Sequence, residues 1–217
     1  MQSLTAENYL KIIYHLSQNN PAPVQTSAIA ERSQTKASSV TDMMKKLADK
    51  GLVDYTKYQG VALTPTGKTT AINIVRKHRL WEVFLVEKLN FKWDEVHDIA
   101  EELEHVNSKE LVERLNAFLN FPTNDPHGDP IPDKDGNFNI DVFIKLSKLK
   151  SGQKGIIMGV SEHSSPFLKH LEKIGLTLGK KLEVMEITDF DGSVELKLEQ
   201  NKINVSRDVA KHLLIKI

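Results

Sequence analysis

Hydrophobic positions in the first third of the chain recur with the spacing of helices and then alternate over a short stretch. The predicted elements are three helices at 5–18, about 26–32 and about 36–50, followed by two short strands within 52–64. Thr5 can cap the first helix, and Gly51 suits the end of the third. The strands turn near Gln59 and Gly60. This order is typical of a winged helix-turn-helix.

The helical pattern continues through the middle of the chain. Thr64 and Pro65 form a helix start, and that helix is predicted to run to about Leu89. Two more helices are predicted within 93–106 and 108–119. A loop rich in Pro, Gly, Asn and Asp follows at 120–137 and marks a boundary.

After this loop the pattern becomes one of short strands. The strand-like segments are 153–160, 180–187, 193–199 and 202–206, with one helix at 164–175. A small β-barrel fits this better than a sandwich, which needs more strands. The predicted fold is mainly α in its N-terminal part, with a C-terminal small β-barrel. The predicted domains are 1–72, 73–140 and 141–217.

Composition narrows the class of protein. The 217 residues are 40% hydrophobic and 27% charged, which is typical of a soluble globular protein. No apolar run reaches the roughly 18 residues that span a membrane, and no signal peptide is recognisable. The absence of cysteine excludes disulfides and thiolate metal sites, so a cytoplasmic protein is expected. The net charge of zero argues weakly against nucleic-acid binding but can hide separate charged regions.

The second helix of the helix-turn-helix would enter the major groove of DNA with its N-terminus first. The candidate DNA contacts are Lys36, Ser38, Ser39, Thr41, Asp42 and Lys45 on this helix, and Lys57 and Tyr58 between the two strands. Hydroxyls can donate to phosphates and lysines neutralise them. Residues 36–59 hold five Lys and three Asp, a small positive excess. The alternative is a helix-turn-helix that serves only structure or protein contacts.

The stretch "HDIAEELEH", residues 97–105, is the candidate for metal chemistry. At about 100° per residue, one face of a helix collects four potential ligands, while apolar residues lie opposite. These four are His97, Glu101, Glu104 and His105. A solvated helix face would show the same pattern. His78 and Glu82, four residues apart in an apolar helix, strengthen the metal interpretation because both would be costly to bury alone.

The ligand types suit some metals and exclude some chemistry. Imidazole and carboxylate without sulfur favour Mn(II), Fe(II), Zn(II) or Co(II) over Cu(I). The chain has no His-Glu-x-x-His, no glycine-rich phosphate loop and no nucleophile elbow. The Glu-x-x-His at 102–105 has no second copy of the kind that di-iron bundles use. An enzyme is therefore not expected.

The order of these segments, with "RKHRL", "EHxxS" and "PHGxxIP", resembles the diphtheria toxin repressor family of metal-dependent regulators over essentially the whole chain. It looks closest to the manganese-responsive branch with a C-terminal SH3-like (FeoA-like) domain. The resemblance implies a homodimeric transcriptional repressor that binds a palindromic site in double-stranded DNA and controls metal homeostasis. It implies Mn(II), with Fe(II) as the alternative metal; Zn(II) or Co(II) can substitute in vitro. No membrane and no small organic substrate are implied, and a winged-helix regulator answering a non-metal ligand is the remaining alternative.

The resemblance also implies two metal sites per chain. The primary site would use Asn8, Glu101, Glu104 and His105. The second would draw on His78, Glu82, His97, Asp125, His127 and Glu162, with His163 as a competitor for Glu162. Glu101 indicates Mn(II), because iron-type members have a cysteine there. Asn8 and Lys11 depart from the manganese pattern, which has Asp and, in some members, a Glu that holds a second ion.

In the family, a metal bridging the first and fifth helices fixes the DNA-binding domain relative to the dimerisation helices of residues 73–140. The resemblance implies the same population shift here, with metal bound more tightly by the DNA-competent state. The expected dimer contact includes Trp81, Phe84, Leu85 and Leu115, and the alternative for these residues is a core within one chain.

Overall fold

The structure is a computed structural model that describes residues 3–18, 22–139, 142–199 and 201–217. It divides into two compact units. The first comprises Met1–His78, Glu101–Val112 and Pro132–Phe138, and the second comprises Arg79–Ala100, Glu113–Ile131 and Asn139–Ile217. The domain boundary expected between 140 and 141 lies outside the described residues. Among the described residues, no helix combines the length and apolar content that crossing a membrane requires.

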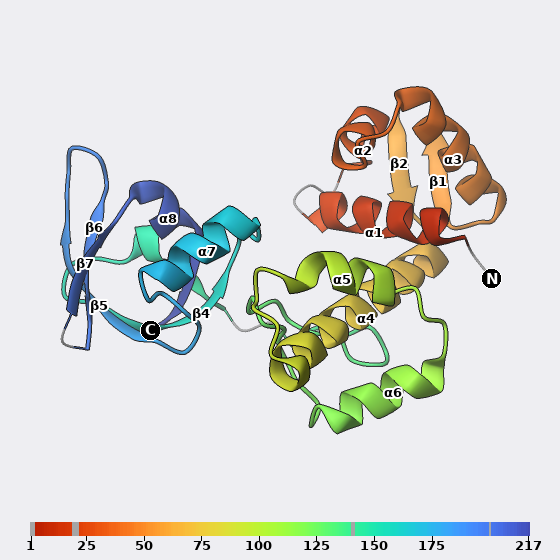
Figure 1. Ribbon diagram of the computed structural model, residues 1–217. Helices are drawn as coiled ribbons and strands as arrows, with labels where there is room; N and C mark the ends of the chain where they lie inside the picture. The colour runs from red at the N-terminus through yellow and green to blue at the C-terminus, as the bar shows by residue number, and fades with distance from the viewer. Residues whose placement is uncertain (1–2, 19–21, 140–141, 200) are drawn as a thin grey trace. The chain divides into compact units, whose positions relative to one another are not determined.

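The first unit contains the winged helix. Its elements are α1 (Leu4–Gln18), α2 (Thr26–Arg32), α3 (Ala37–Asp49), β1 (Val53–Thr56) and β2 (Gly60–Leu63). Figure 1 shows the three helices grouped around the antiparallel β1–β2 hairpin. The side chains that the helical spacing places inward, such as Leu10, Ile13 and Met44, are fully buried. The sequence thus locates these elements to within about a residue at their ends.

The middle of the chain is helical as predicted. It forms α4 (Pro65–Leu89), α5 (Val96–Leu103) and α6 (Lys109–Phe118). The hydroxyl of Thr64 accepts a hydrogen bond from the Gly67 amide at 3.1 Å and so caps α4. Because α4 is 25 residues long, its N-terminal part belongs to the first unit and its remainder to the second.

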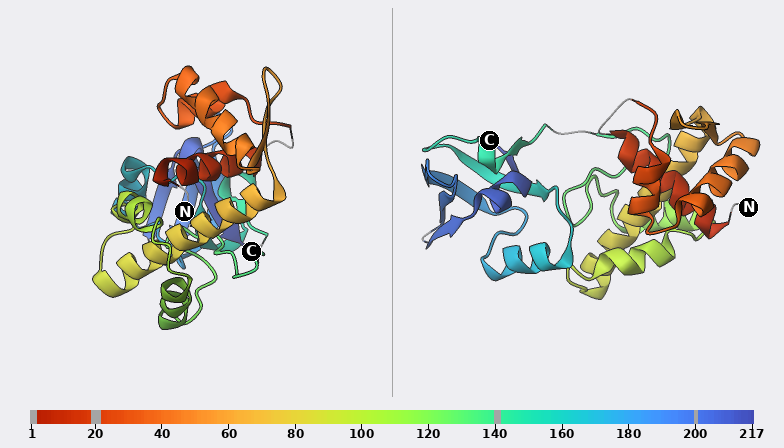
Figure 2. Two further views of the ribbon diagram at one scale, coloured as in Figure 1. Left: turned by 90° about the vertical axis from the view of Figure 1, so that its right-hand side faces the viewer. Right: turned by 90° about the horizontal axis from the view of Figure 1, so that it is seen from above.

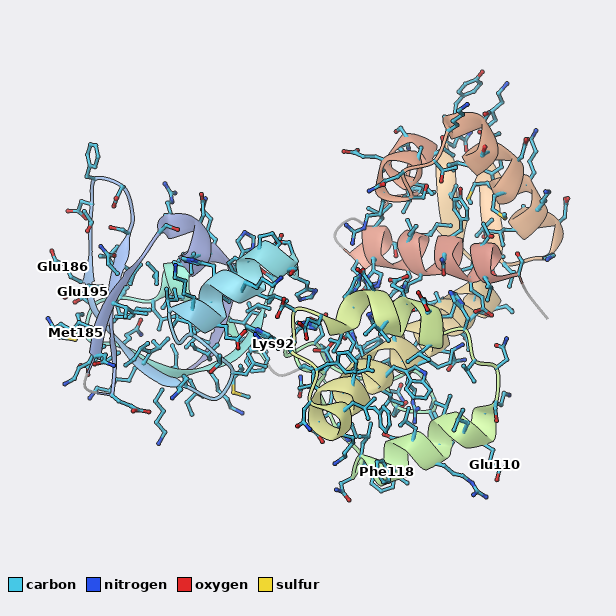
Figure 3. All side chains as sticks on the ribbon, viewed as in Figure 1. Lys92, Glu110, Phe118, Met185, Glu186 and Glu195 are labelled. Carbon is cyan, nitrogen blue, oxygen red and sulfur yellow. The ribbon has the colours of Figure 1, made fainter. Side chains whose placement is uncertain are left out.

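The C-terminal part is an antiparallel sheet with helices packed on it. Its elements are β3 (Ile144–Lys145), the 3₁₀ turn η1 (Leu146–Lys148), β4 (Lys154–Val160), α7 (Ser165–Lys173), β5 (Lys181–Ile187), β6 (Val194–Leu198), β7 (Asn201–Val205), α8 (Arg207–His212) and β8 (Leu213–Lys216). Figure 2 shows these strands, cyan to blue, together with α7 and α8. The six strands run in the order β3-β8-β4-β5-β6-β7, with Glu186 of β5 opposite Glu195 of β6 (Figure 3).

The expected barrel is the point where the fold differs from the prediction. Between the described residues, β3 pairs only with β8 and β7 only with β6, so the sheet is open. The prediction also missed residues 207–217, which form α8 and β8. Ser206 caps α8 by accepting from Val209, and β8 is an interior strand between β3 and β4. Both elements are too short for their period to stand out in the sequence.

Candidate metal centre

The first cluster of ionisable side chains lies in the first unit, where α1 meets the end of α5. Lys11 of α1 places its Nζ 2.5 Å from Oε1 of Glu101 and 2.7 Å from Oε2 of Glu104. Lys11 is 7% exposed and Glu104 is fully buried. The two carboxylates that the helical spacing predicts on one face therefore do meet, but around an ammonium group.

Two histidines complete this cluster. His78 Nδ1 lies 2.6 Å from Oε2 of Glu104, and His105 Nδ1 lies 2.7 Å from Oε2 of Glu7. His105 Nε2 is 3.9 Å from the other Glu104 oxygen, Oε1. That oxygen and the side-chain oxygen of Asn8 are buried and have no hydrogen-bond partner among the residues that the structure describes. Glu7, which the sequence analysis missed, holds the imidazole of His105 in the way that outer carboxylates orient metal-ligating histidines.

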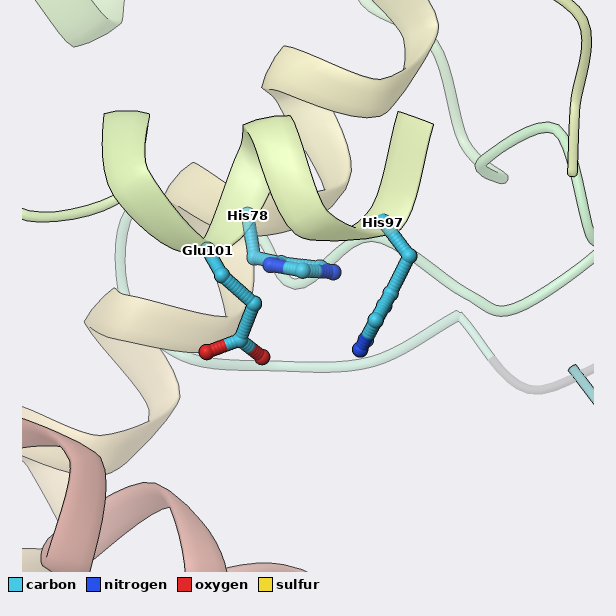
Figure 4. A group of neighbouring side chains, drawn as sticks. All are labelled: His78, His97 and Glu101. Carbon is cyan, nitrogen blue, oxygen red and sulfur yellow. The ribbon is translucent and has the colours of Figure 1, made fainter. Parts of the chain in front are cut away.

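Figure 4 shows His78 of α4 beside Glu101 of α5, with His97 one turn earlier on α5. The side chain of His97 is 52% exposed, and its Nδ1 lies 3.7 Å from Oε1 of Glu82 in the second unit. His97 and Glu101 therefore share one face of α5, as their spacing of four residues predicts.

The second cluster consists of Glu82, Asp125 and His127 and lies wholly in the second unit. All three residues are buried, and each offers one ligand atom within 4.8 Å of the others. His127 Nδ1 lies 3.6 Å from Oε2 of Glu82 and 3.9 Å from Oδ1 of Asp125. Two buried carboxylates and an imidazole are a donor set that suits a divalent cation of the manganese or iron type.

Hydrogen bonds fix the loop that carries this cluster. Nε2 of His127 lies 2.8 Å from the carbonyl oxygen of Trp93. A carbonyl only accepts, so Nε2 carries the proton and Nδ1 faces the carboxylates. Arg79 donates to Oδ2 of Asp129 at 3.1 Å and to the carbonyl of Pro130. Arg79, part of the "RKHRL" motif in the sequence, thus anchors the loop of residues 125–130.

A glycine lets the same loop approach the sheet. Gly128 has φ +91°, and a Cβ there would lie 2.2 Å from the carbonyl oxygen of Met158 in β4. The neighbouring carbonyl of His127 accepts from the Val160 amide at 2.9 Å. A side chain at 128 would therefore displace the loop from β4, which explains the glycine in the "PHG" motif.

Crowding of charge shifts the pKa of two members of the second cluster. Burial, then the charges of Glu82 and Asp129, raise the pKa of Asp125 to about 7. Burial alone would lower the pKa of His127, but the carboxylates of Glu82 and Asp125 raise it to about 9. Without metal, Asp125 and His127 therefore hold protons near neutral pH, and a divalent ion that binds the cluster would displace these protons.

Glu162 and His163, the two candidate ligands in the C-terminal part, differ in their surroundings. The ring of His163 lies 5.0 Å from that of His127, centroid to centroid. Burial lowers the pKa of His163, so its imidazole is neutral at physiological pH and able to bind a metal. Glu162 instead accepts a hydrogen bond from the Ser164 amide at 2.9 Å, before α7. The structure therefore places the ring of His163 beside the second cluster, and Glu162 as a ligand stays a prediction.

The expected DNA contacts lie on one exposed surface of the first unit. Lys36, Ser38, Ser39, Asp42 and Lys45 are exposed, Thr41 is half-buried, and Lys57 and Tyr58 are exposed between β1 and β2. The Thr41 hydroxyl donates to the Ala37 carbonyl within α3. Lys57 lies over the ring of Tyr58, 4.9 Å from its centroid.

Comparison with known families covers most of the chain. Residues 1–61 match the N-terminal DNA-binding domain of iron-dependent repressors, and residues 64–133 match their metal-binding and dimerisation domain. Residues 144–217 match the FeoA domain. The iron-dependent repressor IdeR of Mycobacterium leprae is 33% identical over 168 residues, 73% of each chain. The chain belongs to the diphtheria toxin repressor family.

Solved structures of the family resemble the whole chain. A manganese-dependent transcriptional repressor in complex with manganese is 35% identical, with a TM-score of 0.84 over 97% of this chain and 98% of that one. The manganese regulator SloR is also 35% identical, with a TM-score of 0.73 over 97% of both chains. The diphtheria toxin repressor of Corynebacterium diphtheriae is 29% identical over 97% of this chain and 96% of its own. The family resemblance seen in the sequence is confirmed.

The shifted pKa values predict how this family member responds to pH. Without metal, its stability is expected to fall as the pH rises from about 4 to about 9. Folding raises the pKa of Asp125 from 3.8 to about 7 and that of His127 from 6.5 to about 9. In those two windows the folded chain holds more protons than the unfolded chain, so raising the pH favours unfolding. Thermal unfolding in EDTA across this range measures the effect.

Manganese should reverse this trend, because deprotonated ligands bind it better. The increase in unfolding temperature caused by Mn(II) is therefore expected to grow between about pH 6 and pH 8.5. Asp125→Asn should flatten the lower part of the metal-free profile, since its amide does not titrate. A Mn(II) effect that shrinks as the pH rises would contradict the assignment of these groups to a metal site.

Proposed function

We propose that the chain is a metal-dependent, DNA-binding transcriptional repressor that controls metal-ion homeostasis. The main support for metal dependence is the second cluster, in which Glu82, Asp125 and His127 are buried together. Arg79 Nε lies 3.6 Å from Oδ2 of Asp125 and balances part of this charge, but burying two carboxylates side by side remains costly unless a further cation compensates them. When bound, a divalent ion supplies that charge; His127, fixed through Trp93, supplies a nitrogen ligand, and His163 is placed to add another.

Mn(II) is the proposed metal and Fe(II) the alternative. The second cluster offers carboxylate oxygens and imidazole but no thiolate, and Mn(II) prefers oxygen-rich sites. A structural neighbour is described as a complex with manganese, whereas several relatives are named iron-dependent repressors. Anaerobic measurements of the affinities for Mn(II) and Fe(II), made on the same preparation, would distinguish the two metals.

The proposed partners are double-stranded DNA with a palindromic site and a second copy of the chain. The exposed N-terminal part of α3 would enter the major groove, and the β1–β2 turn would contact phosphates. Of the residues expected at the dimer contact, Leu85 and Leu115 are only 3% and 7% exposed, so they belong to the core of the single chain. In the second unit, Leu89, Phe118 (Figure 3) and Phe121 are 52%, 61% and 66% exposed, and we propose that they contribute to the dimer contact.

Two finer assignments accompany this proposal. We keep the division into a winged-helix domain (1–72), a metal-binding and dimerisation domain (73–140) and a C-terminal domain (141–217). We also propose that the FeoA domain, residues 144–217, functions as an SH3-like module that brings His163 to the metal and adds no DNA contact.

The test is a DNA-binding titration in buffered free metal. Fluorescence anisotropy with a labelled operator fragment is expected to show binding that appears with Mn(II) and is at least about 10-fold weaker in EDTA, because the metal must favour the DNA-competent state. The affinity should fall steeply with salt, since α3 and the wing contact phosphates. Equal affinity with and without every divalent ion tested would overturn the metal dependence. Absence of any salt-sensitive DNA binding would overturn the repressor function.

A further inference from the structure

The ammonium group of Lys11 lies between the two carboxylates of the first cluster, Glu101 and Glu104. The four residues expected to form the primary site include Glu101 and Glu104. Lys11 Nζ is within hydrogen-bond distance of an oxygen of each, at 2.5 Å and 2.7 Å. Those two oxygens cannot also bind a divalent ion, because an ammonium a few ångströms away would repel it strongly in a buried site. While Lys11 holds these two oxygens, the expected four-ligand site is incomplete. Among the described residues, Oε1 of Glu104 and the side-chain oxygen of Asn8 are atoms of that site left without a hydrogen-bond partner.

Both Lys11 and Glu104 are buried, so their ion pair lies inside the fold. Lys11 lies on the inward side of α1, directly after the core residue Leu10. Glu104 is fully buried and its Oε2 also lies 2.6 Å from His78 Nδ1. A carboxylate without solvent needs a compensating positive charge, and the lysine provides it from within the chain.

We propose that Lys11 is a built-in cation that joins α1 to the end of α5 when no metal is bound. The ion pair ties the first helix of the DNA-binding domain to the helix that carries the acidic stretch, a link that otherwise requires an external cation. Because the ammonium belongs to the chain, this link does not require metal. If the proposed function holds, metal control rests mainly on the second cluster of Glu82, Asp125 and His127.

Lys11→Met tests the proposal, because methionine keeps most of the length of the side chain and removes the charge. In EDTA, its unfolding temperature is expected to be about 10 °C lower than that of the unchanged chain, since Glu101 and Glu104 lose their cation. Isothermal titration should also show one additional Mn(II) ion bound per chain, because the freed carboxylates become available as ligands. Adding Mn(II) should then restore most of the lost unfolding temperature.

Two matched variants separate charge from packing. Lys11→Arg keeps the positive charge and should retain the stability in EDTA and the number of bound ions. Lys68→Met makes the same substitution at an exposed lysine of the first unit and should change neither measurement. If Lys11→Met does not fold, Lys11→Gln, which also removes the charge but keeps a polar end, takes its place in both measurements.

Either of two results would overturn the proposal. In the first, Lys11→Met has the same unfolding temperature in EDTA as the unchanged chain and binds the same number of Mn(II) ions. In the second, Lys11→Arg binds an additional ion. Neither result depends on DNA. A loss of metal-dependent DNA binding caused by changes in the second cluster would bear on the proposed function and leave the role of Lys11 untouched.

Discussion

Glu82→Gln is expected to lower the affinity for Mn(II) at the second cluster by at least about 100-fold. Glu82 is 2% exposed and lies 3.6 Å from His127, so it is the carboxylate best placed to share an ion with that imidazole. Glutamine keeps the shape but removes the negative charge that attracts the ion. Isothermal titration gives the affinity, and anisotropy should show that half-maximal DNA binding moves to correspondingly higher Mn(II).

The same change should not unfold the metal-free chain. Glu82 raises the pKa of Asp125, so in the absence of metal the two carboxylates oppose each other. Removing one charge relieves this repulsion but also removes the attraction of Glu82 for the protonated His127, so unfolding in EDTA should occur within a few degrees of the unchanged chain. Glu87→Gln removes an exposed carboxylate from the same helix and should leave both affinity and stability unchanged. Unaltered Mn(II) affinity in Glu82→Gln would rule out the second cluster as the main site.

The fold was predictable where burial follows a regular period over many residues. The hydrophobic spacing located α1 to α6 because one face of each helix packs inward, as Leu10 and Met44 do. It failed for β3, α8 and β8, which span only two to six residues each. Whether a sheet closes into a barrel depends on which strands meet at its edges, and the alternation of side chains carries no information about that.

The residue types of the candidate sites were predictable from the sequence, but the contacts between their side chains were not. Helical spacing predicted Glu101 and Glu104 on one helix face, and the two meet although α5 ends at Leu103, one residue before Glu104. It could not show that Lys11, some 90 residues earlier, would lie between them, because that contact depends on how α1 packs. Nor could it choose between Glu162 and His163, which are adjacent in sequence but differ in which side chain turns toward His127.

Ser39→Glu is expected to abolish DNA binding, lowering affinity by about 100-fold or more, while leaving the fold intact. Ser39 is exposed in the first turn of α3, the end of the helix proposed to enter the major groove. A carboxylate there would face phosphate groups, and like charges at an interface cost several kcal/mol. Anisotropy with the labelled operator at saturating Mn(II) measures the loss.

The same substitution should not destabilise the free protein. The first turn of α3 contains no acidic residue, and a negative charge near a helix N-terminus stabilises the helix by about 0.3 to 1 kcal/mol. Ser39→Glu should therefore unfold at an equal or slightly higher temperature and bind Mn(II) normally. Asn201→Glu adds the same charge at an exposed position of β7 and should bind DNA nearly as well as the unchanged chain. Loss of DNA binding in both variants would point to net charge rather than to α3, whereas normal binding by Ser39→Glu would exclude α3 from the interface.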